Sequence, residues 1–179
     1  MSAIVDTILR LYAIQGQEPY GEVVTIDAHC RQCAALAERE GASKELVAAA
    51  FLHDVGHFTE TPDDAFGVHR HDHGGAEFLK EHFPDSVVEP VRLHVEAKRY
   101  MVAKDPSYFD KLSPASVHTL NHQGGAMSEE EIAAFEAKPY FQDGVKVRQW
   151  DDAGKVEGLV VPDLGHYIRL LEELVLDPM

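Results

Sequence analysis

The stretch AAAFLHDVGH, residues 48–57, ends an apolar run with three ionisable side chains, His53, Asp54 and His57. Ser43 is a good N-cap, and the residues after it predict a buried helix that ends near Gly56. A buried carboxylate without a partner costs several kcal/mol, so polar side chains at the end of such a helix need partners. One divalent or trivalent metal ion would satisfy both His53 and Asp54. The stretch therefore predicts a metal site in the core of a helical protein.

Apolar residues with a helical period extend on both sides of this stretch. They predict helices over residues 4–13, 23–40, 72–82, 86–100 and 140–152, and a terminal helix that carries residues 167–174. Ser113-Pro114 and the near-capping-box sequence Ser128-Glu129-Glu130-Glu131 indicate two further helix starts. No repeat, low-complexity tract or long linker divides the chain. We therefore expect residues 1–179 to form a single all-α domain.

Charge and cysteine content limit the classes of partner. The chain has 31 Asp and Glu against 16 Lys and Arg, a formal net charge of −15. Nucleic acids and anionic membranes are bound through cationic side chains, so both are argued against. No apolar run is long enough to span a bilayer, and we expect no secretory signal. Cys30 and Cys33 are interpreted as buried small residues rather than a redox or zinc pair, and we expect a cytoplasmic protein.

Histidine is the informative residue type, with 11 in the chain. The residues that could join His53 and Asp54 each lie on or beside a different predicted helix, as in metal sites of helical bundles: His29, His71, His94 and Asp151. Imidazoles and carboxylates without a thiolate suit iron or manganese, with zinc as an alternative, and six donors exceed a closed tetrahedral zinc site. Asp54 could bridge two metals. His69 and His73 flank His71, and either could replace it.

The order His … His-Asp … Asp, formed by His29, His53, Asp54 and Asp151, is the signature of the HD-domain superfamily, which this chain resembles. The resemblance implies an HD-domain helical bundle with the metal site in its core. Some members of that superfamily are mononuclear phosphohydrolases and others are dinuclear. The additional histidines, His71 and His94, would complete a second metal site.

The chain resembles one group of the superfamily more closely, the mixed-valence diiron oxygenases that cleave the carbon–phosphorus bond of hydroxyphosphonates. This resemblance extends from about Tyr20 to Tyr167. It rests on Gly21-Glu22, His53-Asp54-Val55-Gly56-His57, His94-Val95-Glu96-Ala97-Lys98-Arg99-Tyr100, Gln123-Gly124-Gly125 and Arg148-Gln149-Trp150-Asp151. It implies two iron ions, Fe(II) and Fe(III), with dioxygen as co-substrate. One iron would bind His29, His53 and Asp151, the other His71 and His94, with Asp54 between them.

The resemblance also implies which residues bind a small organophosphonate. Lys98 and Arg148 would clamp the phosphonate, and each lies one helical turn from a candidate metal ligand. The alternative for both is a salt bridge to a neighbouring carboxylate. His57, Ser116 and Gln123 match positions near the phosphonate, although His57 could instead cap the end of its helix.

Asp54, Glu22 and Tyr20 are the residues for which the resemblance implies a part in catalysis. Glu22 would bind a substrate ammonium group; the alternative is an exposed carboxylate near a helix N-terminus, where negative charge is favoured. The family has a tyrosine three residues before this glutamate, where the chain has Pro19, so Tyr20 is a candidate iron ligand displaced by one residue. A trimethylammonium group could contact aromatic rings, which could equally be core residues: Tyr20, Phe58, Tyr100 and Tyr108.

We therefore expect a diiron oxygenase that uses dioxygen to convert a 1-hydroxy-2-aminoethylphosphonate, or its N-trimethylated analogue, to phosphate and glycine or glycine betaine. The sequence leaves the choice between the primary ammonium and the trimethylammonium substrate open. One alternative is an HD-domain phosphohydrolase that attacks a nucleotide or phosphomonoester with metal-bound water. Another is a degenerate HD domain that only binds a ligand, which the intact signature residues argue against.

Overall fold

The computed structural model describes residues 1–19, 22–59 and 70–176, and these residues form an all-α structure. The helices are α1 (Ala3–Ile14), α2 (Ile26–Arg39), α3 (Lys44–Leu52), α4 (His71–Leu79), α5 (Asp85–Lys104), α6 (Pro114–His122), α7 (Glu129–Glu136), α8 (Phe141–Ala153) and α9 (Leu164–Glu172). Three short 3-10 helices are η1 (Gln15–Gln17), η2 (Val55–Phe58) and η3 (Pro106–Lys111). Within the described ranges there is no strand beyond an isolated bridge between Pro19 and Thr25. The predicted all-α class is confirmed.

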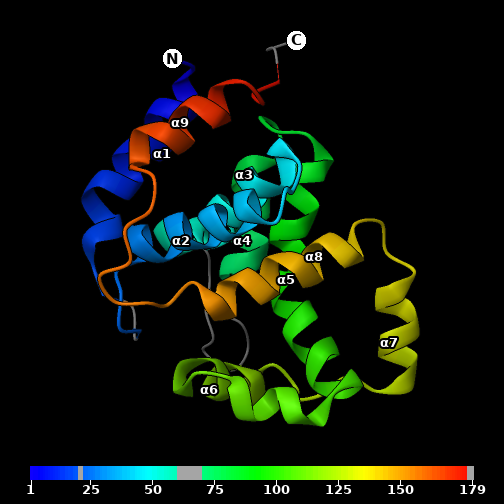
Figure 1. Ribbon diagram of the computed structural model, residues 1–179. Coiled ribbons are helices and arrows are strands. Elements are labelled where there is room, and N and C mark those ends of the chain that lie inside the picture. Colours follow the sequence, from blue (N-terminus) through cyan, green and yellow to red (C-terminus); the bar gives the residue numbers. More distant parts are fainter. Residues whose placement is uncertain (20–21, 60–69, 177–179) are drawn as a thin grey trace.

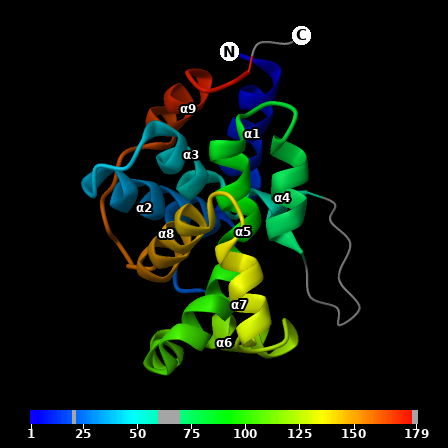
Figure 2. The same cartoon turned by 90° about the vertical axis from the view of Figure 1, so that its right-hand side faces the viewer.

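The long helix α5 runs through the molecule and organises the others (Figure 1). Helices α3, α4 and α8 pack directly against it. Helices α1, α2 and α9 complete the bundle around its first half, whereas α6 and α7 lie around its second half (Figure 2). No helix in the part of the chain that the structure describes has both the length and the apolar character of a membrane span.

The main core fixes the end of α3, where the decisive stretch lies. Its centre is a stack of three rings, with Phe51 between Tyr12 and Tyr167 at centroid distances of 4.6 and 5.2 Å. The Tyr12 hydroxyl donates a hydrogen bond of 2.7 Å to the carbonyl oxygen of Phe51. These contacts hold the backbone immediately before His53, so the polar side chains that follow start from a rigid base.

The structure corrects the predicted end of the third helix. Helix α3 ends at Leu52 rather than near Gly56, and the chain continues as the 3-10 helix η2. At Asp54 the backbone leaves helical geometry, with φ −99° and ψ 7°. Gly56 then packs directly on the His71 carbonyl oxygen, which a Cβ atom at residue 56 would overlap. The bend therefore places η2 against α4, and only glycine allows this approach.

Helix α2 also starts later than the pattern predicts, at Ile26 rather than near Val23. Thr25 caps it, since its side chain accepts a hydrogen bond from the backbone amide of Ala28. The other expected helices, including the one that carries Arg148 and Asp151, are present close to their predicted positions.

Candidate metal centre

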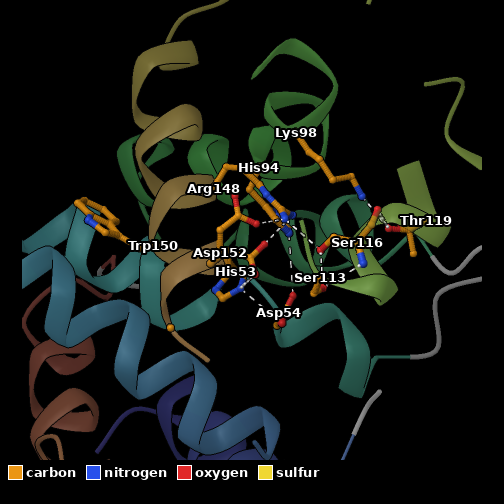
Figure 3. Close-up of polar contacts among 12 residues, drawn as sticks. His53, Asp54, His94, Lys98, Ser113, Ser116, Thr119, Arg148, Trp150 and Asp152 are labelled. Carbon is orange, nitrogen blue, oxygen red and sulfur yellow. Dashed lines mark hydrogen bonds and ion pairs between the residues drawn. The ribbon is translucent and has the colours of Figure 1, made fainter. Parts of the chain in front are cut away.

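The six side chains predicted to bind metal converge beside the first half of α5. Four helices and the turn after α3 supply them: His29 from α2, His53 and Asp54 from the end of α3, His71 from α4, His94 from α5 and Asp151 from α8. All except His71 are buried. Figure 3 shows His53, Asp54 and His94 pointing toward one another from different segments.

His29, His53 and Asp151 form a first group. The Nε2 atom of His29 lies 3.2 Å from His53 Nε2 and 3.2 Å from Asp151 Oδ1. Asp54 joins them through Oδ2, which is 3.6 Å from His29 Nε2 and 3.4 Å from His53 Nε2. Two ligands of one metal, each bonded at about 2.1 Å, lie roughly 3.0–3.4 Å apart. The spacing in this group fits a common metal ion.

The backbone sets which nitrogen of each ring faces this group. The Nδ1 atoms of His29 and His53 lie 2.8 Å from the carbonyl oxygens of Gly154 and Ala50. A carbonyl oxygen only accepts, so Nδ1 carries the proton and both Nε2 lone pairs face each other. Burial lowers the pKa of His29, but Asp151 and Asp54 outweigh burial and raise it above its ordinary value. The group therefore favours a positive charge at its centre.

Gly154 makes the contact with His29 possible. It follows α8, and a Cβ atom there would lie 2.5 Å from the Cys33 Sγ atom. Cys33 itself is buried beside His29 and donates to the Trp150 carbonyl oxygen at 3.3 Å. Both cysteines are free thiols, buried as the sequence predicts.

His71 and His94 form a second group on the other side of Asp54. Their Nε2 atoms are 3.1 Å apart, and Asp54 Oδ1 is 3.4 Å from His71 Nε2 and 4.0 Å from His94 Nε2. His57 lies beside them, with Nε2 3.7 Å from the same oxygen. Asp54 thus turns Oδ2 to the first group and Oδ1 to the second. A carboxylate with this orientation is suited to bridge two metal ions.

Electrostatics keep the second group in the protonation states that metal ligands need. Burial lowers the pKa of His71 and of His94 to about 4, so both rings stay neutral at neutral pH. Burial raises the pKa of Asp54, but His53 and the neighbouring histidines outweigh it and hold the pKa below its ordinary value. His73 lies elsewhere: it contacts Arg70 and Asp72. His69 and Tyr20 fall outside the described residues.

A cavity of about 160 Å³ opens beside the two groups. Candidate metal ligands Asp54, His71 and Asp151 form part of its wall. The remaining wall includes all the described residues that the sequence predicts to bind substrate: Glu22, His57, Lys98, Ser116, Gln123 and Arg148. Concave sites with a few convergent polar groups are typical of small-molecule binding.

Lys98 enters the cavity from α5 and is buried. Its Nζ atom donates a hydrogen bond of 2.7 Å to Thr119 Oγ1 on α6 (Figure 3). Burial, with the positive charge of Arg148 as the second cause, lowers the pKa of Lys98 to about 7. An anion in the cavity would draw a proton onto this amine, because the charged form would then gain a partner.

Arg148 has two functions that the sequence offered as alternatives, since it lines the cavity and forms salt bridges. Its Nη1 atom lies 2.8 Å from Asp151 Oδ2, and Nη2 pairs with Asp152. It also donates to Ser116 Oγ and to the Tyr108 hydroxyl, both at 3.1 Å. Arg148 therefore fixes the orientation of Asp151 while one side of its guanidinium group faces the cavity.

Lys155 is a cavity residue that the sequence analysis missed. Its Nζ atom lies 2.8 Å from Glu22 Oε1 and 3.7 Å from Asp151 Oδ1. The same Glu22 oxygen accepts a 2.8 Å hydrogen bond from Ser113 Oγ. Only 10% of the Glu22 side chain is exposed, so the surface alternative for this residue is wrong. The signal in the sequence was the spacing, because Lys155 lies one helical turn after Asp151.

Gln123 and the aromatic residues differ in how they meet the cavity. The Oε1 atom of Gln123 is buried without a hydrogen-bond partner among the described residues, as expected of an amide that contacts a ligand. None of the described Phe, Tyr or Trp residues lines the cavity. Phe58 packs on Tyr12, and Tyr100 packs on Phe135. The cation–π contacts considered for these rings are therefore replaced by core packing.

Comparison with known proteins agrees with this geometry. Residues 26–137 match the family model described as HD domain. The chain is 40% identical over 178 residues to [1-hydroxy-2-(trimethylamino)ethyl]phosphonate dioxygenase (glycine-betaine-forming) of Leisingera caerulea, covering 96% of this chain and 90% of the relative. It is 41% identical over 168 residues to hydroxymethylphosphonate dioxygenase of Gimesia maris, covering 91% and 84%. An uncharacterized protein of Acanthamoeba polyphaga mimivirus is 37% identical over 176 residues, covering 94% and 80%.

Proposed function

We propose that this chain, which belongs to the HD-domain family and is similar along most of its length to two phosphonate dioxygenases, is an oxygenase that cleaves the carbon–phosphorus bond of a 1-hydroxyphosphonate. The products would be phosphate and the carboxylate formed from the hydroxyl-bearing carbon. The free thiols of Cys30 and Cys33 favour the cytoplasm as its compartment.

One observation carries the proposal: Asp54 presents one carboxylate oxygen to each of two histidine groups. A mononuclear hydrolase needs only the first group. The second group, His71 and His94, has no structural need for two neutral imidazoles 3.1 Å apart in a cavity wall. We assign two iron ions to these groups, because nitrogen and oxygen donors without a thiolate suit iron. Bound there, the irons would supply the activation of dioxygen and the oxidation of the substrate carbon.

The chain's own residues would hold the substrate against that centre. Lys98 and the cavity-facing side of Arg148 provide positive charge for the phosphonate, and the Gln123 amide and Ser116 hydroxyl provide hydrogen bonds. His57, half-buried beside Asp54, would contact the same phosphonate. Rigid placement of the substrate by these groups favours reaction at one carbon atom.

Phosphate release from hydroxyphosphonates, with and without dioxygen, tests the proposal on iron-loaded protein. We expect release that requires dioxygen and one equivalent of oxygen consumed per phosphate. The alternative, a metal-dependent phosphohydrolase, would release phosphate from phosphomonoesters under argon. Such turnover, without oxygen-dependent release from any hydroxyphosphonate, would reject the oxygenase.

A further inference from the structure

Glu22 is the residue that would meet an amino group on the substrate, and in this structure its charge is already balanced. Lys155 places its ammonium group 2.8 Å from Glu22 Oε1. Ser113 donates to the same oxygen. Lys155 and Glu22 are 87% and 90% shielded at their side chains, with exposures of 13% and 10%.

A substrate ammonium group would have to displace this lysine from Glu22. Lys155 would then retain only the more distant Asp151 oxygen, at 3.7 Å, as its described carboxylate partner. Removing one partner from a shielded ion pair is strongly unfavourable, because the other charge stays away from water. The pair therefore opposes entry of a second cation.

The rest of the cavity gives an ammonium group no other partner of the expected kind. Aromatic rings that bind trimethylammonium groups are absent from the lining among the described residues. Asp54 and Asp151 face the histidine groups, and Asp151 is also paired with Arg148. The positive charges of Lys98, Arg148 and Lys155 instead suit an anion with a neutral remainder.

We propose that Lys155 is a selectivity residue that stands beside Glu22 in place of a substrate ammonium group, so that the preferred substrate is a 1-hydroxyphosphonate without an amine. Hydroxymethylphosphonate is the smallest member of that class. This inference rests on the proposed function and replaces the amino-substituted substrates that the sequence alone favoured.

Binding measured by calorimetry under nitrogen tests this selectivity apart from catalysis. Iron-loaded protein is titrated with hydroxymethylphosphonate, with 1-hydroxy-2-aminoethylphosphonate and with its trimethylammonio form. We expect hydroxymethylphosphonate to bind at least about tenfold more tightly than either amine. Equal or tighter binding of an amine by the wild-type protein would overturn the inference.

Variants assign the effect to the ion pair. Lys155→Met keeps the length of the side chain and frees Glu22, so we expect affinity for the primary amine to rise by roughly tenfold. Adding Glu22→Gln to Lys155→Met should remove that gain, and Lys155→Arg should keep the wild-type order. Lys146→Met is the matched control, because Lys146 pairs with Glu40 on the surface, outside the cavity. Equal changes for all three ligands in Lys155→Met would contradict a selectivity role.

Phosphate release in air from the same samples separates the two proposals. Oxygen-dependent release combined with a preference for an amine keeps the oxygenase and rejects the role of Lys155. The expected binding order without release from any of the three compounds supports the role of Lys155 and rejects the oxygenase.

Discussion

The two histidine groups on either side of Asp54 differ in how open they are. The side chains of His29 and His53 are 0% exposed, whereas those of His71 and His57 are 16% and 26% exposed. In the first group the two rings are anchored to backbone carbonyl oxygens, and Asp151 is held by Arg148. The second group forms part of the cavity wall through His71. The difference suggests that the first group retains its metal while the second exchanges ligands during turnover.

Asp54 links the groups, so its removal is the most severe test of the comparison. We expect Asp54→Ala to lose iron from both groups and to show no measurable phosphate release, because each group loses its shared carboxylate oxygen. Iron analysis and phosphate release measure this. Asp72→Ala is a control that removes another buried aspartate, one that pairs with His73 instead. Full iron content in Asp54→Ala would show that the groups do not share this residue.

Removing a ligand from the second group should affect only that group. We expect His71→Ala or His94→Ala to lower the iron content to about half, because the more closed first group keeps its ligands. His53→Ala should lower iron at least as far. Iron per chain, measured after dialysis against a weak chelator, tests the order. Full iron retention in both His71→Ala and His94→Ala would refute the assignment of the second group.

Two glycines position the two groups, and substituting each should disturb its own group. Gly154→Ala places a methyl group against Cys33, and we expect a loss of roughly 1–3 kcal/mol of stability with weaker iron binding in the first group. Gly56→Ala pushes on the His71 carbonyl oxygen and should disturb the second group. Cys33→Ala should restore part of the stability in Gly154→Ala, yet none in Gly56→Ala. Denaturant unfolding measures both, and equal rescue would contradict the separation.

Lys98 should affect substrate binding and leave both groups loaded. We expect Lys98→Ala to keep its iron and to bind hydroxymethylphosphonate roughly tenfold more weakly, as when a charged hydrogen bond is lost. Calorimetry under nitrogen and iron analysis of the same sample provide the two readouts. Loss of iron in this variant would mean that Lys98 supports the metal centre instead.

The low pKa of Lys98, about 7, gives this contribution a pH dependence. An anion binds the protonated amine, so the affinity should fall as the pH rises above about 7, down to the level of Lys98→Ala. Folding stability depends on the same group with the opposite sign: the unfolded amine is protonated up to its ordinary pKa, so the contribution of Lys98 to stability rises with pH between about 7 and 10.5. Lys98→Arg, which stays charged, should show no such fall in affinity.

The sequence predicted the helices and the residues that meet, but not how their side chains pair. Spacing along a helix shows that Arg148 and Asp151 share a face, and the order of histidines indicates a common site. The pairing of Glu22 with Lys155 joins residues 133 positions apart, and no local pattern reports it. The early end of α3 has the same cause, because the bend at Asp54 depends on Gly56 meeting α4.

The convergence of His29 and Asp151 also bears on the chain entropy of the unfolded protein. Ligands from these two residues close a loop that contains most of the chain, and a covalent cross-link over about 100 residues is worth about 4–5 kcal/mol. A tightly bound ion acts on the folded state alone and resembles such a cross-link. Iron supply would then set how long each copy of the protein survives in the cell, in addition to how fast it works.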